Sequence, residues 1–220
     1  MYLTKMQVTN IKMVILSILN NIKNDYKGFS ITDCFDRVYL YKKDYLPQEF
    51  NNKIVFISGN SFQQNHRILS KSIRKFVNSL IENEILLLCI GGESYIYGIT
   101  NKYIKKIYHY TNSRYIYNDC EYNNKFYKKD LENNHIDYND DKLIIVSDIN
   151  VCLINLSNLT KNLINKLDKN NYKKIIIISC HHEDFWKKIK NFKNYKLKKR
   201  KYFICDKIRY FITVNIFYKN

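Results

Sequence analysis

Two consecutive glycines, Gly91 and Gly92, mark the position in the sequence that is best suited to binding a ligand. They follow an unbroken apolar run at 85–90, which is typical of a strand buried on both faces of a sheet. Glycines at the carboxyl end of such a strand permit a tight turn and let a ligand approach the backbone closely. The pattern indicates a nucleotide-type binding crevice, although strand, glycine turn and helix also occur in ordinary α/β folds.

Cysteine is the second residue type with chemistry to offer, and the chain has six. They lie far apart, without a Cys-x-x-Cys pair, and several fall within apolar runs. We therefore expect reduced thiols in the core rather than disulfides. His181 and His182 follow Cys180 directly and offer metal ligands, but no second pair of ligands accompanies them. The sequence predicts no metal site.

The charge of the chain favours a polyanionic partner. Lys and Arg number 37 against 20 Asp and Glu, a formal net charge of +17, and nucleic acid is the usual partner of such a surplus. A strongly AT-rich genome would also raise the Lys count, so coding bias is the alternative. The segment 187–202 is densely basic and carries aromatic residues, and we expect it to contact RNA.

No apolar stretch is long enough to span a bilayer, and the N-terminus lacks a convincing signal peptide. The sequence therefore predicts a cytoplasmic protein without a membrane partner. A protein partner stays open.

The elements that must position these residues fall into two regions. Apolar residues at helical spacing predict a helix at 4–24, which Gly28 ends, and 29–50 reads as irregular. We interpret 1–50 as an N-terminal accessory segment, helix plus irregular, and 51–220 as the main domain.

Strands and helices alternate along the main domain. The predicted strands are 53–57, 85–90, 107–110, 143–147 and 174–179, and the predicted helices are 68–81, 94–103, 112–123, 156–167 and 181–192. A polar stretch at 124–141 holds at most a weak strand near 125–128. Two extended segments at 195–205 and 208–218 predict a closing antiparallel hairpin. This order predicts an α/β fold, the Rossmann-like class I methyltransferase fold with a mixed seven-stranded sheet ending in an antiparallel hairpin.

Four short motifs resemble, in order and spacing, those of RNA uracil-5 methyltransferases, which methylate tRNA or rRNA with S-adenosylmethionine. They are Ser-Phe-Gln-Gln-Asn at 61–65, Leu-Cys-Ile-Gly-Gly at 88–92, Glu-Tyr-Asn at 121–123 and Ile-Ile-Ile-Ser-Cys at 176–180. The resemblance covers the chain from Ile57 onward and implies a diverged catalytic domain that acts in tRNA or rRNA processing. It implies RNA as the partner, S-adenosylmethionine as the cofactor, and cofactor contacts from Gln64, Gly91 and Gly92.

The resemblance also makes Cys180 the catalytic nucleophile. Carbon 5 of uracil is too weak a nucleophile to take a methyl group directly. A thiolate that adds at carbon 6 turns the base into an enolate, and a general base must afterwards remove the proton from carbon 5. The alternative is that Cys180 is one more small buried residue.

The chain departs from the family pattern at four places. Glu93 stands where the cofactor loop has its second glycine, and Thr111 where an acid holds the ribose hydroxyls. Asp148 matches the acid after the fourth strand only with a one-residue shift, which would reverse its face in a strand. Nothing after Asp206 is acidic, so the usual general base is missing.

Two functions therefore compete on the sequence alone. One is an RNA methyltransferase with an altered site. The other is a catalytically inactive methyltransferase fold that binds RNA or a protein partner. A small-molecule methyltransferase is disfavoured by the charge.

Overall fold

A computed structural model describes residues 29–32, 38–41, 45–58, 61, 67–138, 146, 149–156, 159–180, 182–205 and 210–220. The helix predicted at 4–24 lies outside these residues. Within them, no helix is long and apolar enough to cross a membrane.

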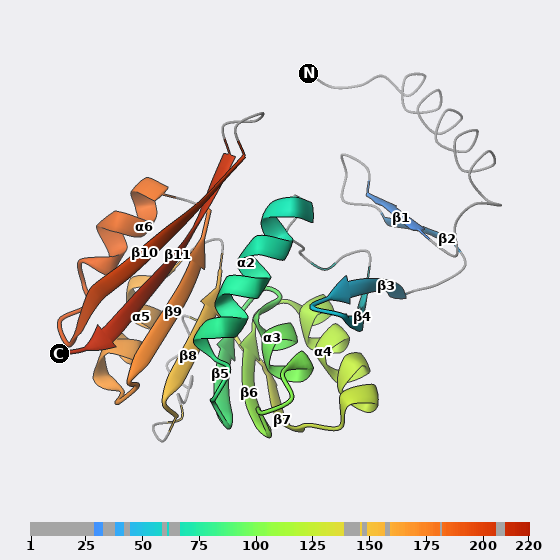
Figure 1. The fold of residues 1–220 in the computed structure, drawn as a ribbon, viewed down its shortest axis with the longest axis horizontal. Coiled ribbons are helices and arrows are strands. Elements are labelled where there is room, and N and C mark those ends of the chain that lie inside the picture. Colours follow the sequence, from blue (N-terminus) through green and yellow to red (C-terminus); the bar gives the residue numbers. More distant parts are fainter. Residues whose placement is uncertain are drawn as a thin grey trace.

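A mixed sheet of seven strands forms the centre of the fold (Figure 1). Its strands are β5 (Leu86–Ile90), β6 (Lys106–Thr111), β7 (Asp130–His135), β8 (Val151–Asn155), β9 (Lys174–Ser179), β10 (Tyr195–Cys205) and β11 (Tyr210–Lys219). The order is β10-β11-β9-β8-β5-β6-β7. Five neighbouring strands are parallel, and β11 runs antiparallel to both β9 and β10. This confirms the predicted fold class, including the closing hairpin.

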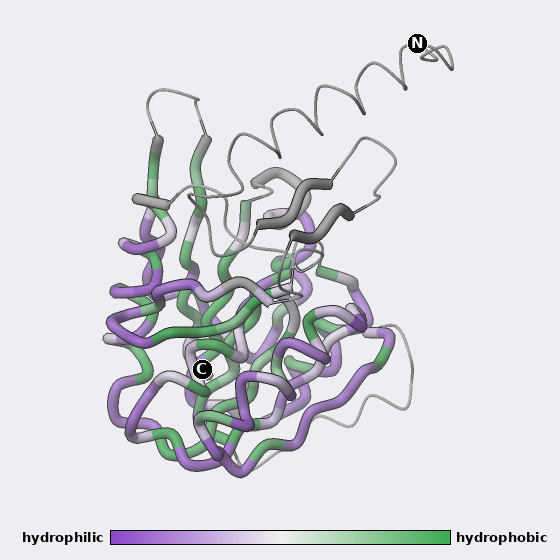
Figure 2. The backbone as a smooth tube through the Cα atoms, turned by 90° about the vertical axis from the view of Figure 1, so that its right-hand side faces the viewer, coloured by the Kyte–Doolittle hydropathy of each residue, from purple (hydrophilic) through white to green (hydrophobic). Residues whose placement is uncertain are grey.

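Helices cover both faces of the sheet, which is why its central strands are continuous apolar runs rather than alternating ones. The helices are α2 (Arg67–Leu80), α3 (Ser94–Thr100), α4 (Arg114–Tyr127), α5 (Lys161–Lys169) and α6 (His182–Ile189). The first three pack on one face and the last two on the other (Figure 1). In Figure 2 the hydrophobic colour runs mainly along the strands between these layers.

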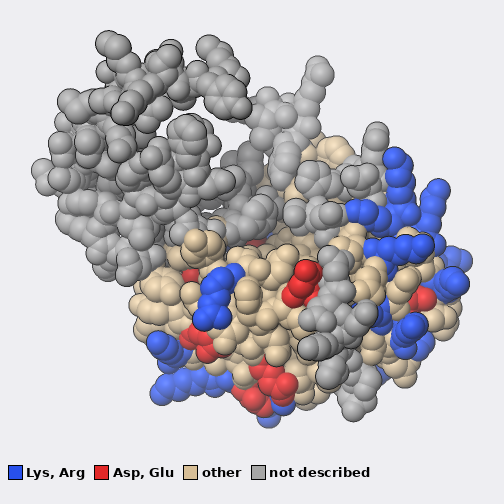
Figure 3. All heavy atoms as spheres, turned by 180° about the vertical axis from the view of Figure 1, so that it is seen from behind, with Lys and Arg blue, Asp and Glu red and all other residues tan. Residues whose placement is uncertain are grey.

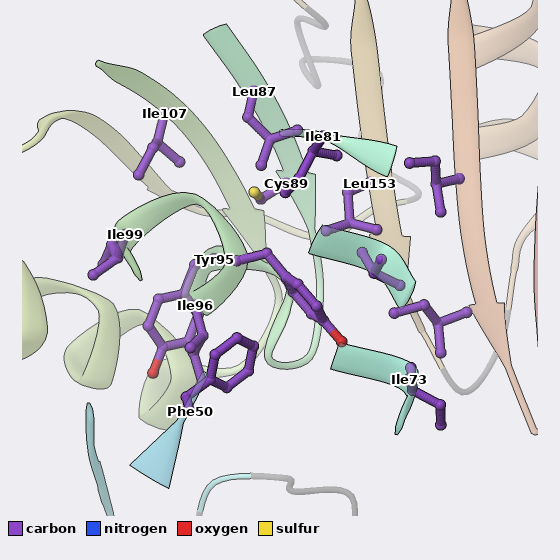
Figure 4. Packing of buried hydrophobic residues seen from close by; sticks show 14 of the residues in the cluster. Phe50, Ile73, Ile81, Leu87, Cys89, Tyr95, Ile96, Ile99, Ile107 and Leu153 are labelled. Atoms are coloured by element: carbon purple, nitrogen blue, oxygen red, sulfur yellow. The ribbon is translucent and has the colours of Figure 1, made fainter. Parts of the chain in front are cut away.

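The larger apolar layer lies between the sheet and α2, α3 and α4. Figure 4 shows Leu87 and Cys89 of β5 and Ile107 of β6 facing Ile96 and Ile99 of α3. All five are completely buried. The short helix α3 is buried along its whole length, so it fixes the residues that precede it, among them Gly91 and Gly92.

Strands also occupy the region before the main sheet. The irregular reading of 29–50 is wrong, because β1 (Phe29–Thr32) pairs with β2 (Val38–Tyr41), and β3 (Tyr45–Phe50) pairs with β4 (Lys53–Ser58). Asn51 and Asn52 join β3 to β4 with φ of 50° and 62°. Asparagine tolerates this left-handed conformation, and a two-residue turn of this kind matches the twist of a hairpin. The predicted boundary between 50 and 51 falls at this turn.

Side chains of α4 form hydrogen bonds with the backbone groups of β4 on the edge that does not pair with β3. Tyr127 Oη donates to the carbonyl of Ile54 at 2.7 Å. Asn123 accepts from the N–H of Phe56 at 2.8 Å and donates to its carbonyl at 2.6 Å. Asp119 accepts from the N–H of Ser58 at 3.2 Å.

These contacts form a regular ladder because two periods agree. Four residues of helix rise about 6 Å and two residues of strand about 6.6 Å, so every fourth residue of α4 meets every second residue of β4. We call this the α4–β4 ladder. It joins the β3–β4 hairpin to the main domain.

Two predicted strands differ from the structure. The weak strand near 125–128 is wrong, since α4 continues to Tyr127 and the strand is β7. The strand predicted at 143–147 lies mostly outside the described residues, and its one clearly described residue, Val146, is not in a strand. The strand that pairs with β5 in this part of the chain is β8, and the helix predicted from 156 begins only with α5.

His109 of β6 should make the stability of the fold sensitive to acid. Its ring is completely buried, and Nδ1 donates to Asn133 Oδ1 at 2.7 Å. Burial disfavours the charged ring and lowers the pKa of His109 from 6.5 to about 4. The unfolded chain therefore binds this proton first, and stability present above pH 6.5 is lost as the pH falls toward 4.

We expect this single group to remove about 3 kcal/mol of unfolding free energy across that interval. Urea unfolding between pH 7 and pH 4 measures the slope for wild type, His109→Gln and, as a control, His135→Gln in the exposed end of β7. The His109 variant should lose the extra slope and the His135 variant should keep it. Equal slopes in all three proteins would contradict the assignment.

Candidate functional site

The candidate site lies at the carboxyl ends of β5, β6, β8 and β9. The chain runs from β5 to β6 and β7 on one side, and then returns to β8 on the other side of β5. Ligands of open α/β sheets bind at such a switch point, outside the carboxyl ends of the strands. The predicted crevice therefore sits where the topology allows a ligand.

Hydrogen bonds to β6 and from the start of α3 hold the glycine turn after β5. Gly91 and Gly92 have φ of 68° and 46°, which is the left-handed region that favours glycine. The N–H of Gly91 donates to the carbonyl of Tyr110 in β6 at 2.8 Å. The hydroxyl of Ser94, at the start of α3, donates to the carbonyl of Gly91 at 2.5 Å.

The chain after β8 fills the space that the glycines leave. A Cβ on Gly91 would lie 2.1 Å from Leu156 Cδ2, and a Cβ on Gly92 would lie 2.6 Å from the carbonyl oxygen of Asn155. The sequence suggested that these glycines make room for a ligand. In the structure they first make room for Asn155 and Leu156.

Asn155 is a polar residue at this edge that the sequence did not predict as part of the site. It ends β8, is 7% exposed, and lies with Cγ 3.0 Å from the Cβ position of Gly92. Its side-chain amide makes no hydrogen bond to the described residues. The signal that could have found it is a polar residue ending the apolar run 151–154, but the fourth strand was expected earlier, at 143–147.

Glu93 explains one departure from the family pattern. Its φ is −84°, so the position needs no glycine. The carboxylate is 4% exposed and pairs with Arg74 of α2 at 3.0 Å. The Arg74 guanidinium in turn lies 4.4 Å from the centroid of the Phe50 ring. Burial raises the pKa of Glu93, and the Arg74 charge and hydrogen bond oppose that rise.

Thr111 ends β6 next to the turn, but its side chain is buried and hydrogen-bonded within the protein. It is completely buried, and its hydroxyl accepts from the N–H of Ser113 at 3.1 Å. The next residue, Asn112, is exposed, and its N–H donates to the Tyr138 hydroxyl at 3.2 Å. The amide side chain of Asn112 is therefore the polar group that this strand end offers to a ligand.

Cys180 follows β9, on the other side of β8 from the glycine turn. It is half-buried and packs against the core on the α2 side of the sheet. Gln64, Asp148 and His181 lie outside the described residues, and β8 begins only after Asp148 in the chain. The structure thus brings Gly91, Gly92 and Thr111 together and puts Cys180 at the same edge of the sheet.

Metal ligands do not gather at this edge. Among residues that the structure describes, no group of three or more His, Cys, Asp or Glu could hold a metal ion.

The fold is shared with solved structures, whereas no protein-family model and no curated protein matches the chain. The tRNA (uracil-54, C5)-methyltransferase of Pyrococcus abyssi, solved with S-adenosyl-L-homocysteine, is similar at a TM-score of 0.70 and 14% identity, over 89% of this chain and 52% of that one. The tRNA m1G37 methyltransferase of M. jannaschii is similar at a TM-score of 0.63 and 16% identity, over 82% of this chain and 58% of that one. The chain thus spans just over half the length of these two enzymes.

A third similar structure is M. jannaschii TYW2, solved with S-adenosylmethionine, with a TM-score of 0.61 and 12% identity over 86% of this chain and 92% of that one. At these identities the likeness establishes the fold. The chain has the Rossmann-like fold seen in tRNA methyltransferases.

The Arg74–Glu93 ion pair should be essential to the stability of the turn. Removing Arg74 leaves a buried carboxylate without a partner, which typically costs about 3–5 kcal/mol. We expect Arg74→Met to lose an amount of this order in urea unfolding, and Arg74→Met with Glu93→Gln to recover most of it. A small loss in the single variant, or no recovery in the double variant, would show that the pair does not hold α2 to the turn.

Proposed function

We propose that this chain transfers a methyl group from S-adenosylmethionine to a base of RNA, at the carboxyl ends of β5, β6 and β8. The observation that carries the proposal is Asn155, a residue only 7% exposed whose side-chain amide makes no hydrogen bond to the described residues, against a left-handed glycine turn at the switch point. Two of the similar structures are named as tRNA methyltransferases, and two hold S-adenosylmethionine or its demethylated product.

The residues at this edge fit that cofactor. The Asn155 amide can donate to a carboxylate and accept from an ammonium group, both of which the methionine part carries. Asn112 offers a second amide to the ribose hydroxyls in place of the committed Thr111. Gln64 and Asp148 remain predicted contacts. When bound, the cofactor supplies an electrophilic methyl group.

The target that the resemblance favours is carbon 5 of uracil, with Cys180 as nucleophile. The Cys180 thiolate would add to carbon 6, and carbon 5 would take the methyl group from the sulfonium, which leaves S-adenosylhomocysteine. A general base would then take the carbon 5 proton, which expels Cys180 as a thiolate and restores the double bond. Cys180 lies between the end of β9 and the start of α6, at the same edge of the sheet as the glycine turn.

The basic surface supports RNA as the partner. β10 lies at the edge of the sheet, with Lys201 Nζ 4.4 Å from the Phe76 ring centroid on one side. On the other side the Arg200 guanidinium lies 3.3 Å from the ring centroid of Trp186 in α6. In Figure 3, Lys and Arg gather toward the side of the molecule that carries α6 and the β10–β11 hairpin. Such pairs of cation and ring suit a backbone of phosphates with stacked bases.

A second candidate function is RNA binding without catalysis. The observation that favours it is Leu156, whose side chain covers Gly91. The committed hydroxyl of Thr111 and the absence of acidic residues after Asp206 in the sequence agree with it.

Replacement of Asn155 by Leu keeps the size of the side chain and removes its polar atoms. We expect a loss of about tenfold or more in cofactor affinity and methyl transfer, since the amide binds charged groups. Nucleoside mass spectrometry of RNA incubated with protein and labelled cofactor measures the transfer, and Asn118→Leu on the exposed face of α4 is the matched control. Transfer at the wild-type rate by Asn155→Leu would remove this residue from the site.

RNA containing 5-fluorouracil separates the two functions, because fluorine at carbon 5 cannot leave as a proton does. A methylating enzyme should form a protein–RNA adduct that survives a denaturing gel, in the presence of cofactor. Cys180→Ala should lose the adduct, and Cys120→Ala, which removes a core thiol of α4, should keep it. No adduct with wild type would favour binding without uracil methylation, and an adduct with Cys180→Ala would identify another nucleophile.

A further inference from the structure

A cluster of aromatic rings lies on the outer side of the α4–β4 ladder. The rings of Tyr45 and Tyr122 are stacked, with centroids 4.0 Å apart and planes at 7°. Phe56 lies 5.7 Å from Tyr122 and 5.1 Å from Phe126, and Tyr122 lies 5.5 Å from Phe126. We call these four residues the aromatic patch.

The aromatic patch belongs to neither core. None of its members is part of the two buried clusters, whereas Val55 and Ile57, on the opposite face of β4, are. Phe126 is 57% exposed, and Ile54 beside Phe56 on the same face of β4 is 59% exposed. The other three rings are half-buried, so each leaves part of its surface outside the core, and a contiguous aromatic surface of this kind can mark a binding site.

The α4–β4 ladder makes the patch rigid. Asn123 and Tyr127 bind the backbone of Phe56 and Ile54 directly. The rings of Phe56, Tyr122 and Phe126 are thus carried by two elements that are bonded to each other, and they need little ordering when a planar ligand stacks on them.

A lysine borders the aromatic patch. Lys125 is exposed, and its Nζ lies 5.9 Å from the Tyr122 ring centroid. The exposed residue Glu49 pairs with Ile54 across the hairpin on the same face. Rings flanked by lysine suit an unpaired nucleotide, whose base stacks while its phosphate meets the charge.

We propose that the aromatic patch stacks an unpaired base of the bound RNA, outside the methyl-transfer site. The choice of RNA rests on the proposed function, but the stacking surface does not require catalysis. The patch would hold nucleotides away from the target base, because Tyr122 and Phe126 lie in the second half of α4, which starts at the carboxyl end of β6 and runs away from it.

The test is the affinity of the full chain for a fluorescent single-stranded RNA, measured by anisotropy over a salt series. Loss of one stacked base should weaken binding by about fivefold or more in Phe126→Ala, at every salt concentration. The slope against salt should stay that of wild type, because stacking releases no counterions. Phe126→Trp should retain the affinity.

Two controls separate stacking from general effects. Tyr103→Ala removes an exposed ring next to Lys102, in the turn between α3 and β6, and should bind as wild type. Replacing Lys198, Lys199 and Arg200 of β10 by Glu should flatten the salt slope instead.

Three results would overturn the proposal. They are wild-type affinity in Phe126→Ala, an equal loss in Tyr103→Ala, and no RNA binding by wild type. If Phe126→Ala binds RNA as tightly as wild type but elutes as a smaller particle than wild type on size-exclusion chromatography, the patch binds a second copy of the chain. A protein that shows the Phe126 effect but transfers no methyl group would refute the proposed function and leave the stacking surface in place.

Discussion

The contact between the chain after β8 and the glycine turn after β5 is the constraint on which the candidate site depends. Both glycines have left-handed φ, and a side chain on either would collide with Asn155 or Leu156. The turn therefore fixes how closely β8 approaches β5 at the switch point. It also sets the start of the fully buried helix α3, and through Glu93 it is tied to Arg74 of α2. One local geometry thus connects two strands, two helices and the group best suited to bind a ligand.

The α4–β4 ladder covers a strand edge that would otherwise be open. Unpaired N–H and C=O groups on an edge invite pairing with other chains. Here side chains spaced four residues apart on α4 replace the missing strand along β4. Asp119 is buried in this arrangement, which raises its pKa, while hydrogen bonds from Ser58 and Ser61 counter that effect. Since the inner face of α4 is used in this way, its outer face is left to carry the aromatic patch.

Much of the fold could be predicted from the sequence, because its central strands β5 and β9 are short apolar runs and the closing hairpin is rich in β-branched and aromatic residues. The missed elements are those stabilised in other ways. β7 is polar (Asp-Leu-Glu-Asn-Asn-His), and Asn133 on it binds the buried His109 instead of adding apolar area. The β3–β4 hairpin depends on the left-handed turn at Asn51 and Asn52, and its first strand, β3, lacks a continuous apolar run. In the site, Gly91, Gly92 and Cys180 follow from sequence, but Asn155 does not, because two apolar runs compete to be the fourth strand.

Calorimetric titration of the full chain with S-adenosylmethionine tests the central claim most directly, since binding can be measured without knowing the RNA target. The account predicts saturable binding to one site, and its loss in Gly92→Ala, where the new Cβ would push Asn155 away from the turn. Circular dichroism shows whether that variant is folded. Absence of heat with wild type at millimolar cofactor would contradict the account, because a site formed by the Gly91–Gly92 turn and Asn155 would then bind no such ligand.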